Sequence, residues 1–258
     1  MTVLDEIIAG VLADLEGRQA VRPLESLQEA VRGLRPCDPK PALEAPGLAV
    51  IAEVKRASPS KGRLAAIDDP AALALAYQRG GAAAISVLTE ARRFRGSLAD
   101  LTAVRAAVGL PLLRKDFVVT EYQLWEGAAA GADLALLIVA ALTAAQLADY
   151  LDLGRQLGLT CLVEAHTPDE VRRARDAGAE VLGINNRNLK TLDVDLANFE
   201  QMASLIDGSA IRVAESGILS LDDARRMRDA GADAVLVGEL LVRDGDPAAM
   251  VAALRSLA

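Results

Sequence analysis

The sequence of 258 residues predicts an α/β protein, a closed (β/α)8 or TIM barrel preceded by an N-terminal helical extension. Eight short apolar runs alternate with helix-like segments, a Gly-Ala turn recurs along the chain, and polar side chains gather at one end of the runs. We expect one domain over residues 1–258, with the extension in residues 1–47 and the barrel in residues 48–258. An open parallel sheet is the alternative fold for the same sequence pattern.

The extension begins with the segment MTVLDEIIAGVLADLEGR. This segment is acidic and amphipathic, so it predicts a helix rather than a signal peptide, which would be basic and then apolar. The segment RPCDPKPALEAPG (35–47) is predicted to be a linker into the first strand.

The apolar runs of the barrel are nearly continuous in hydrophobic residues, which is typical of strands buried on both faces of a parallel sheet. Because helical patterns separate them, right-handed βαβ units are expected. The runs occupy residues 48–54, 82–89, 111–117, 133–139, 160–166, 180–186, 211–217 and 233–239.

The helical segments carry start and stop signals. Thr143, Thr167 and Ser220 stand where helix N-caps are expected. A Gly-Ala pair ends every second helix, and a glycine cap there leads directly into the next strand. This spacing of about two βα units favours a closed barrel over an open sheet. The glycines are Gly81, Gly131, Gly178 and Gly231.

Composition limits the partners and ligands. The net charge of -8 argues against nucleic acid as a partner, because nucleic-acid phosphates are bound by clusters of basic residues. Cys37 and Cys161 cannot build a disulfide framework, and His166 is the only histidine, so no metal site is expected. The longest apolar stretch, residues 134–142, is too short to cross a bilayer. We expect a cytoplasmic protein without nucleic-acid or membrane partners.

The carboxyl ends of the predicted strands carry the polar residues, whereas the opposite ends are apolar or bland. Active sites of (β/α)8 barrels lie at the carboxyl ends of the strands. This polarity predicts a site there, built from Glu53, Lys55, Lys115, Glu164, Asn185, Arg187, Glu215, Ser216 and Gly238.

Lysine usage points to two of these residues. The chain has 23 arginines and only five lysines, yet Lys55 and Lys115 sit inside strands, each beside an arginine. Neighbours in a strand face opposite sides, so one of each pair can point into the barrel. A lysine that is desolvated near another cation has a lowered pKa and can act as a general acid, which arginine cannot do. Each of these lysines is therefore a candidate general acid.

Further pairs fit a site for an anionic substrate. Glu53 and Lys55 lie two residues apart on one strand face and can pair, and Glu164 ends a buried strand as a candidate base. Asn185 shares a face with Arg187. Glycines after the seventh and eighth strands, Gly217 and Gly238, are where these barrels usually bind phosphate.

Several longer motifs occur in order from about residue 48 to 242. They are EVKRASPSKG (53–62), SVLTE (86–90), FRGS (94–97), LLRKDF (112–117), LVE (162–164), GINNRNL (183–189), AESGI (214–218) and LVGE (236–239). Together with the extension, these motifs resemble the indole-3-glycerol phosphate synthase family of tryptophan biosynthesis. The resemblance implies a lyase that closes the ring of 1-(2-carboxyphenylamino)-1-deoxyribulose 5-phosphate without metal or cofactor and releases carbon dioxide and water. It implies a small phosphorylated substrate, and we expect a monomer.

The resemblance also implies roles for single residues. Lys115 is the candidate acid for ring closure, and Glu164 and the Glu53/Lys55 pair are candidates for the dehydration, without a fixed division between acid and base. Asn185 is also expected to take part in catalysis. The other substrate-binding residues are Ser58, Phe94, Phe117, Leu136, Arg187, Glu215, Ser216 and Leu236. The phosphate is expected at Lys55, Ser58, Ser216, Gly217, Gly238 and the amide of Glu239, with the Glu239 carboxylate turned away.

Two other functions stay open on the sequence alone. Phosphoribosylanthranilate isomerase, another phosphate-binding barrel enzyme, would want a cysteine where this chain has Glu53 and Lys55. A non-catalytic barrel that senses a phosphometabolite would not need two inward lysines with facing carboxylates.

Overall fold

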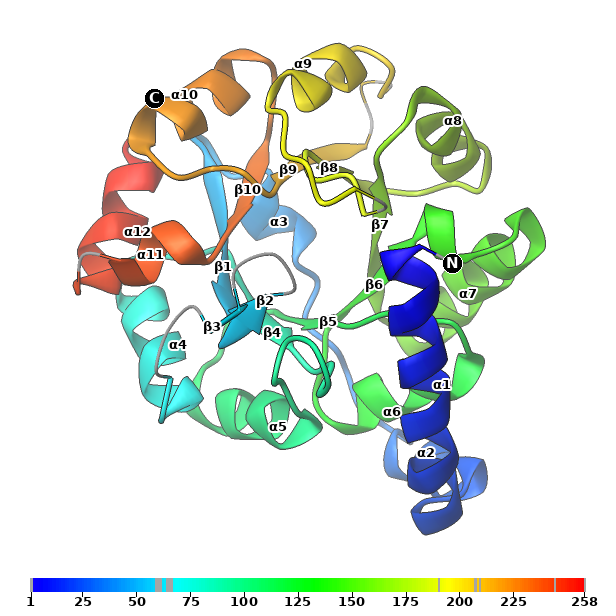
Figure 1. Cartoon of the computed structure of the whole chain (residues 1–258). Coiled ribbons are helices and arrows are strands. Elements are labelled where there is room, and N and C mark those ends of the chain that lie inside the picture. Colours follow the sequence, from blue (N-terminus) through cyan, green and yellow to red (C-terminus); the bar gives the residue numbers. More distant parts are fainter. Residues whose placement is uncertain are drawn as a thin grey trace.

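The computed structural model describes residues 2–58, 62–63, 67–189, 191–206, 208, 210–243 and 245–257. Residues 59–61 of the first motif lie outside this part of the chain. Eight parallel strands close into a barrel in the order β1-β4-β5-β6-β7-β8-β9-β10, and β10 pairs with β1 (Figure 1). These strands are β1 (Ala49–Val54), β4 (Ala84–Leu88), β5 (Leu112–Lys115), β6 (Leu134–Ile138), β7 (Thr160–Ala165), β8 (Val181–Asn185), β9 (Ile211–Glu215) and β10 (Ala234–Val237).

Each strand lies within one of the predicted apolar runs, and closure of the barrel excludes the open sheet. Strand β1 ends with its run at Val54, and the other seven strands end one or two residues before their runs, because the last residues of those runs already belong to the loops above the barrel. One small hairpin was not predicted. It pairs β2 (Ala57–Ser58) with β3 (Gly62–Arg63) above β1.

Helices surround the barrel (Figure 1). The predicted caps are confirmed, because the hydroxyls of Thr143, Thr167 and Ser220 accept backbone hydrogen bonds in the first turns of α7, α8 and α10. The repeated glycines all have positive φ, from 81° to 98°, as a turn between helix and strand requires. The helices are α4 (Pro70–Arg79), α5 (Leu98–Ala107), α6 (Glu121–Ala129), η1 (Val139–Ala141), α7 (Ala144–Leu157), α8 (Pro168–Asp176), α9 (Ala197–Ala203), α10 (Leu221–Asp229), α11 (Glu239–Arg243) and α12 (Pro247–Arg255).

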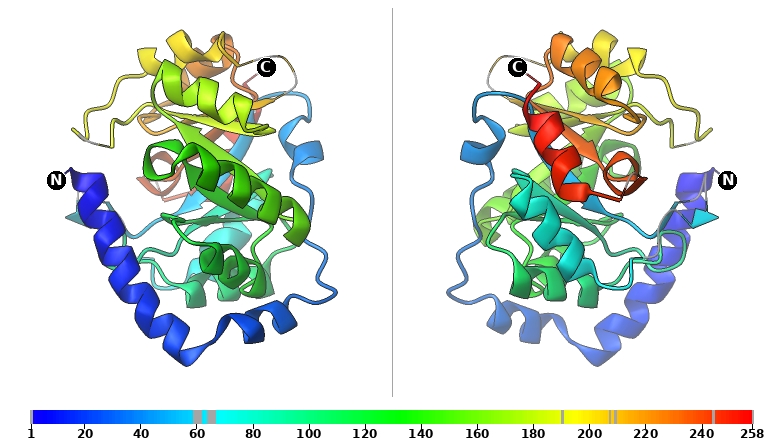
Figure 2. Two further views of the ribbon diagram at one scale, coloured as in Figure 1. Left: turned by 90° about the vertical axis from the view of Figure 1, so that its right-hand side faces the viewer. Right: turned by 90° about the vertical axis from the view of Figure 1, so that its left-hand side faces the viewer.

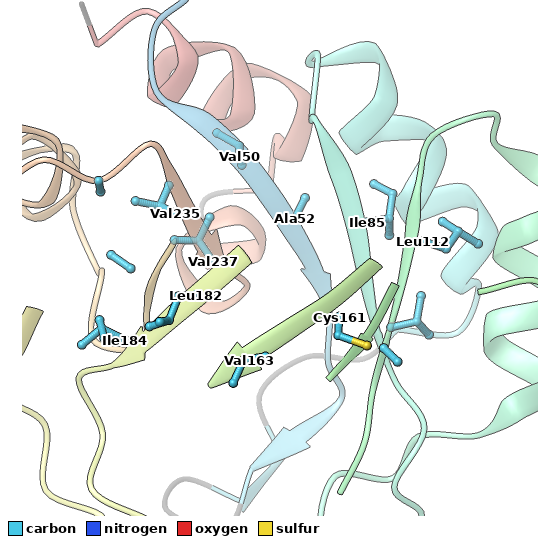
Figure 3. Close-up of a cluster of buried hydrophobic side chains, with 14 of the residues drawn as sticks. Val50, Ala52, Ile85, Leu112, Cys161, Val163, Leu182, Ile184, Val235 and Val237 are labelled. Atoms are coloured by element: carbon cyan, nitrogen blue, oxygen red, sulfur yellow. The ribbon is translucent and has the colours of Figure 1, made fainter. Parts of the chain in front are cut away.

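The apolar core has an outer and an inner part. The outer part fills the space between strands and helices with outward side chains such as Val50, Ile85 and Val163 (Figure 3). The inner part fills the barrel, where alternate strands contribute layers of side chains. One such layer consists of Ile51, Leu113, Leu162 and Val213.

The extension wraps around the barrel from one end to the other (Figure 2). Helix α1 (Val3–Val21) lies over the carboxyl ends of the strands, α2 (Leu24–Ala30) contacts α6, and α3 (Lys40–Leu43) lies at the opposite end. The prediction of a linker over 35–47 was partly wrong, because a helical turn forms where Pro41 favours a helix start and Leu43 is buried against the barrel. Among the described helices, none is both long and apolar enough to cross a membrane.

Candidate active site

A cavity of about 350 Å³ opens at the carboxyl ends of the strands. Every residue that the sequence proposed for the site lies on its wall, although these residues come from all eight barrel strands or the loops after them. They are Glu53, Lys55, Ser58, Phe94, Lys115, Phe117, Leu136, Glu164, Asn185, Arg187, Glu215, Ser216, Gly217, Leu236, Gly238 and Glu239.

The floor of the cavity is a charged layer of the barrel interior. Two residues beyond the apolar layer of Ile51, Leu113, Leu162 and Val213, the inward side chains of β1, β5, β7 and β9 are all ionisable. They are Glu53, Lys115, Glu164 and Glu215, and each carboxyl is almost fully buried. An apolar barrel therefore ends in three carboxyls and one ammonium group beneath the substrate space.

Lys115 lies between two of these carboxyls. Its Nζ is 3.3 Å from Glu164 Oε2 and 3.5 Å from Glu215 Oε2. Burial lowers the pKa of Lys115, but the charges of Glu164, Glu215 and Glu53 outweigh burial and raise the pKa above its ordinary value. The lowering that desolvation near another cation can produce is therefore not found at Lys115. The neighbouring cation, Arg114, points out of the barrel and forms its ion pairs there.

Glu215 is the carboxyl with the most perturbed protonation. Burial raises its pKa to about 8; Lys115 opposes this rise, and the charges of Glu164 and Glu53 add to it. Its Oε1 has no hydrogen-bond partner among the described residues. A Cβ at Gly183 would lie 2.0 Å from this oxygen, so only glycine leaves room for the carboxyl. Burial therefore favours the protonated, neutral form of Glu215.

Glu164 is held by a chain of hydrogen bonds. Asn185 Nδ2 donates to Glu164 Oε1 at 2.9 Å, and the Arg187 amide donates to Asn185 Oδ1 at 2.9 Å. Because Lys115 approaches the other oxygen, both oxygens of Glu164 are fixed. The carboxylate is placed firmly enough to act as a base or to hold Lys115 in position.

The end of β1 forms a second ion pair at the cavity wall. Lys55 pairs with Glu53, as their spacing predicted. A Cβ at Gly238 would lie 2.8 Å from Glu53 Oε2, so this glycine makes room for the carboxylate. Arg56 points away and binds the Asp100 carboxylate and the Ile67 carbonyl, which anchors the loop after β1.

An apolar slot lies opposite the charged floor. The rings of Phe94 and Phe117 have centroids 6.0 Å apart and planes inclined at 40°, with Leu136 and Leu236 nearby on the wall. Sequence reasoning missed the contribution of the extension, because α1 places Val3, Leu4 and Ile7 on the same wall. The helical spacing of Leu4, Ile7, Val11 and Leu15 indicates the buried face of α1, but it does not say what the helix covers.

The other end of the cavity is built from turns after β9 and β10. Ser216 and Gly217 both have positive φ, of 65° and 79°, and Gly238 leads directly into the short helix α11. Turns after the seventh and eighth strands together with a short extra helix are the usual phosphate site of such barrels. Glu239 lines the cavity, and its charge raises the pKa of Arg187, which burial lowers more strongly.

Comparisons with known proteins identify relatives over nearly the whole chain. A family model described as indole-3-glycerol phosphate synthase matches residues 4–254. The chain is 58% identical over 255 residues to the indole-3-glycerol phosphate synthase of Streptomyces griseus subsp. griseus, covering 98% of this chain and 95% of the relative. It is 57% identical over 262 residues to that of Micrococcus luteus, covering 99% and 98%.

Solved structures with a similar fold have little sequence similarity. The 3-hexulose-6-phosphate synthase of Salmonella typhimurium matches with a TM-score of 0.67 at 14% identity, over 81% of this chain and 98% of that one. The thiamine phosphate pyrophosphorylase of Pyrococcus furiosus matches with a TM-score of 0.62 at 16% identity, over 81% and 94%. At these identities the likeness shows the barrel fold alone.

Proposed function

The chain belongs to the indole-3-glycerol phosphate synthase family, and we propose that Lys115 is the general acid of its ring closure. The enzyme is a carboxy-lyase of tryptophan biosynthesis. It converts 1-(2-carboxyphenylamino)-1-deoxyribulose 5-phosphate into indole-3-glycerol phosphate, carbon dioxide and water. The position of Lys115, protonated on the cavity floor between two carboxyls, is the observation that carries the proposed role.

Ring closure needs a proton donor. The ring carbon that bears the carboxylate attacks the ketone carbon, and the ketone oxygen gains negative charge as the new carbon-carbon bond forms. Lys115, which the surrounding carboxyls keep protonated, donates its proton to this oxygen because an alkoxide is more basic than an amine. Loss of carbon dioxide then returns the bonding electrons to the ring.

Dehydration needs an acid and a base. The hydroxyl formed from the ketone leaves as water once it is protonated, and a proton leaves the five-membered ring as the indole forms. We assign proton removal to Glu164, whose oxygens are fixed by Asn185 and Lys115. We assign protonation of the leaving hydroxyl to Lys55 in its pair with Glu53. The neutral Glu215 acid is proposed to donate a hydrogen bond to the substrate.

The remaining cavity residues are proposed to orient the substrate. The aromatic ring fits the slot of Phe94, Phe117, Leu136 and Leu236, because apolar walls and tilted rings suit an aryl group. Arg187 is proposed to bind the substrate carboxylate, because its guanidinium group lies on the cavity wall. The phosphate is assigned to Lys55, Ser58, Ser216 and the amides of Gly217, Gly238 and Glu239.

The rival functions account less well for this site. An isomerase acting on phosphoribosylanthranilate was expected to use a cysteine near the end of β1, where Glu53 and Lys55 form an ion pair. A phosphometabolite sensor gives no reason to bury three carboxyls around one lysine, since buried charges are costly unless they are used or paired. We propose that the enzyme works in the cytoplasm as a monomer, with the whole chain as one domain.

Replacement of Lys115 tests the proposal. Lys115→Met keeps the length of the side chain but removes the proton, so kcat should fall by about 10²- to 10⁴-fold while substrate binding is kept. Product formation is followed by indole-type fluorescence, and binding is measured by calorimetry. Lys40→Met is the matched control, because Lys40 forms an exposed ion pair with Glu180 near the other end of the barrel. A Lys115→Met enzyme with near-normal kcat removes Lys115 from this role.

A further inference from the structure

A buried charged network lies directly behind Lys115, on the outer face of β5. Arg114 is only 1% exposed, and each of its three guanidinium nitrogens donates a hydrogen bond. Nε donates to Thr89 Oγ1, Nη1 to the carbonyl of Gln123, and Nη2 to both Asp116 and Glu126. We call Arg18, Thr89, Arg114, Asp116 and Glu126 the Arg114 network.

Asp116 connects this network to the cavity. Its Oδ2 accepts hydrogen bonds from Thr89 Oγ1 at 2.6 Å and from Arg114 Nη2 at 3.0 Å, and its Oδ1 accepts from the Phe117 amide at 2.9 Å. The backbone of Lys115 is held as well, because the Thr89 amide donates to its carbonyl at 3.1 Å. The residues on both sides of Lys115 are therefore held in place, Arg114 by its side chain and Asp116 by its carboxylate. The backbone of Phe117 is held as well, through its amide and its carbonyl.

Glu126 connects the same network to the extension. Its Oε2 accepts from Arg114 at 2.9 Å, and its Oε1 accepts from Nε of Arg18 in α1 at 2.8 Å. Helix α1 passes alongside α6 and over the barrel mouth (Figure 1). The first turns of α1 carry Val3, Leu4 and Ile7 on the cavity wall. One carboxylate thus joins the helix that covers the cavity to the strand that carries the proposed acid.

We propose that the Arg114 network is a positioning network that couples the docking of α1 to the placement of Lys115 and Phe117. Asp116 lies on the cavity wall, but both of its carboxylate oxygens are engaged by Thr89, Arg114 and the Phe117 amide, so we assign it a positioning role through the strand and loop that it holds. Glu126 lies behind the strand, away from the cavity lining. The proposal rests on the proposed role of Lys115 as the acid.

The physical reason lies in the geometry of buried charge-assisted hydrogen bonds. Arginine offers a rigid fork of donors, and two carboxylates that meet this fork in a buried site fix the backbone around it. Removal of one partner leaves an unpaired buried charge, so the remaining groups move to find new partners. A displacement of about 1 Å at a reacting group can cost about 10²-fold in rate. A loss of α1 docking at Arg18 is therefore transmitted to Lys115 through Glu126 and Arg114.

A double-mutant cycle on kcat tests the coupling. Asp116→Asn alters the end of the network next to Lys115, and Arg18→Met cuts the end on α1. The two side chains are not in direct contact, so independent effects should multiply within about twofold. We expect Asp116→Asn to lower kcat by about tenfold or more with KM within about threefold. Arg18→Met should lower kcat in both backgrounds. The fold-loss in the Asp116→Asn background should be at least about fivefold smaller than the fold-loss in the otherwise unchanged enzyme.

The matched control is a second ion pair of α1. Arg92→Met removes the pair between Arg92 and Asp14, which docks the same helix but lies outside the Arg114 network. Its effect on kcat should be the same with and without Asp116→Asn. All rates are measured at least 15 °C below the melting temperature of each variant, so that unfolding does not enter kcat.

The outcomes separate this proposal from the role of Lys115. Independent effects of Asp116→Asn and Arg18→Met, or a normal kcat in Asp116→Asn, overturn the positioning network. Coupling of Arg92→Met as strong as that of Arg18→Met also overturns it, because the effect then belongs to α1 docking in general. Should Asp116→Asn not fold, Thr89→Val takes its place, since it removes the hydroxyl between Asp116 and Arg114. An active Lys115→Met enzyme refutes the acid role whatever the cycle shows.

Discussion

Glu215 should destabilise the folded enzyme at alkaline pH, and its replacement by glutamine should remove this effect. The carboxyl is buried beside Glu164 and Glu53, and burial raises its pKa to about 8. In the unfolded chain a glutamate has an ordinary pKa of about 4.3. Between these two values the folded protein holds a proton that the unfolded chain has released. Stability therefore falls as the pH rises from about 4.3 to 8 and is level above 8.

The size of the effect follows from the two pKa values. The difference between pKa values of about 4.3 and 8, at 1.36 kcal/mol per pH unit, gives about 5 kcal/mol. Glu215→Gln keeps the shape of the side chain and cannot ionise, so its stability should lie within about 1 kcal/mol of the native chain near pH 5 and exceed it by about 5 kcal/mol near pH 9. For a chain of this length each kcal/mol shifts the melting temperature by about 2–4 °C. The gain in melting temperature at pH 9 should be at least about 10 °C.

The assay compares the two proteins by thermal unfolding, followed by circular dichroism, in steps from pH 5 to pH 9. Only the difference between the proteins is informative, because other groups give both of them a common pH dependence. Glu200→Gln is the matched control. Glu200 lies on the surface, and its hydrogen bond with Arg226 lowers its pKa, so its replacement should give no gain at alkaline pH.

Parallel stability curves for the native chain and Glu215→Gln would falsify the buried neutral acid. Such curves would mean that Glu215 is ionised at neutral pH in the folded protein, paired with Lys115. The proposed hydrogen bond from Glu215 to the substrate would then be lost as well. A lower kcat in Glu215→Gln together with a higher melting temperature would instead show that the Glu215 carboxyl lowers the stability of the enzyme but is needed for its activity.

Three further changes test other parts of the site. Gly183→Ala places a methyl group against the Glu215 carboxyl, so kcat should fall about tenfold or more and overpacking should lower the free energy of unfolding by about 1–3 kcal/mol. Steady-state kinetics and melting curves measure the two effects, and normal kinetics would contradict the steric reasoning. Lys55→Arg keeps the charge opposite Glu53 but cannot release a proton, so kcat should fall at least about 10²-fold; a loss below tenfold in single-turnover rates means that only the charge matters. Asp133→Asn weakens hydrogen bonds from the backbone of both β5 and the extension, so the free energy of unfolding measured in urea should fall by about 2–4 kcal/mol. An unchanged urea midpoint would show that Asp133 does not stabilise the contact between the extension and β5.

Most of the fold and the location of the site follow from local patterns in the sequence. The strands are buried on both faces, so their hydrophobic runs stand out, and the glycines between helix and strand repeat with every second βα unit. In a parallel barrel all carboxyl ends of the strands meet at one face. A polar residue at the end of a run, such as Glu164, can therefore be placed in the site without a structure.

Other properties depend on contacts between distant parts of the chain. The pKa of Lys115 is set by carboxyls from three other strands, and only the register of the closed barrel brings them to one height. The apolar face of α1 is visible in the sequence, but its place over the cavity depends on the path of residues 22–47 around the barrel. The space for the Glu215 carboxyl likewise depends on Gly183 in the neighbouring strand β8.

The different environments of Arg114 and Lys115 explain why the chain uses arginine at one position and lysine at the next. Arg114 faces outward into a buried space with two carboxylates, a hydroxyl and a carbonyl, and only a guanidinium group offers enough fixed donors to satisfy them all. Lys115 faces inward, where a group that can release its proton is required by the proposed chemistry. A permanently charged fork would block the proton transfer at position 115, and an ammonium group would leave acceptors unpaired at position 114. The two cations are therefore not interchangeable, although they contribute equally to the net charge.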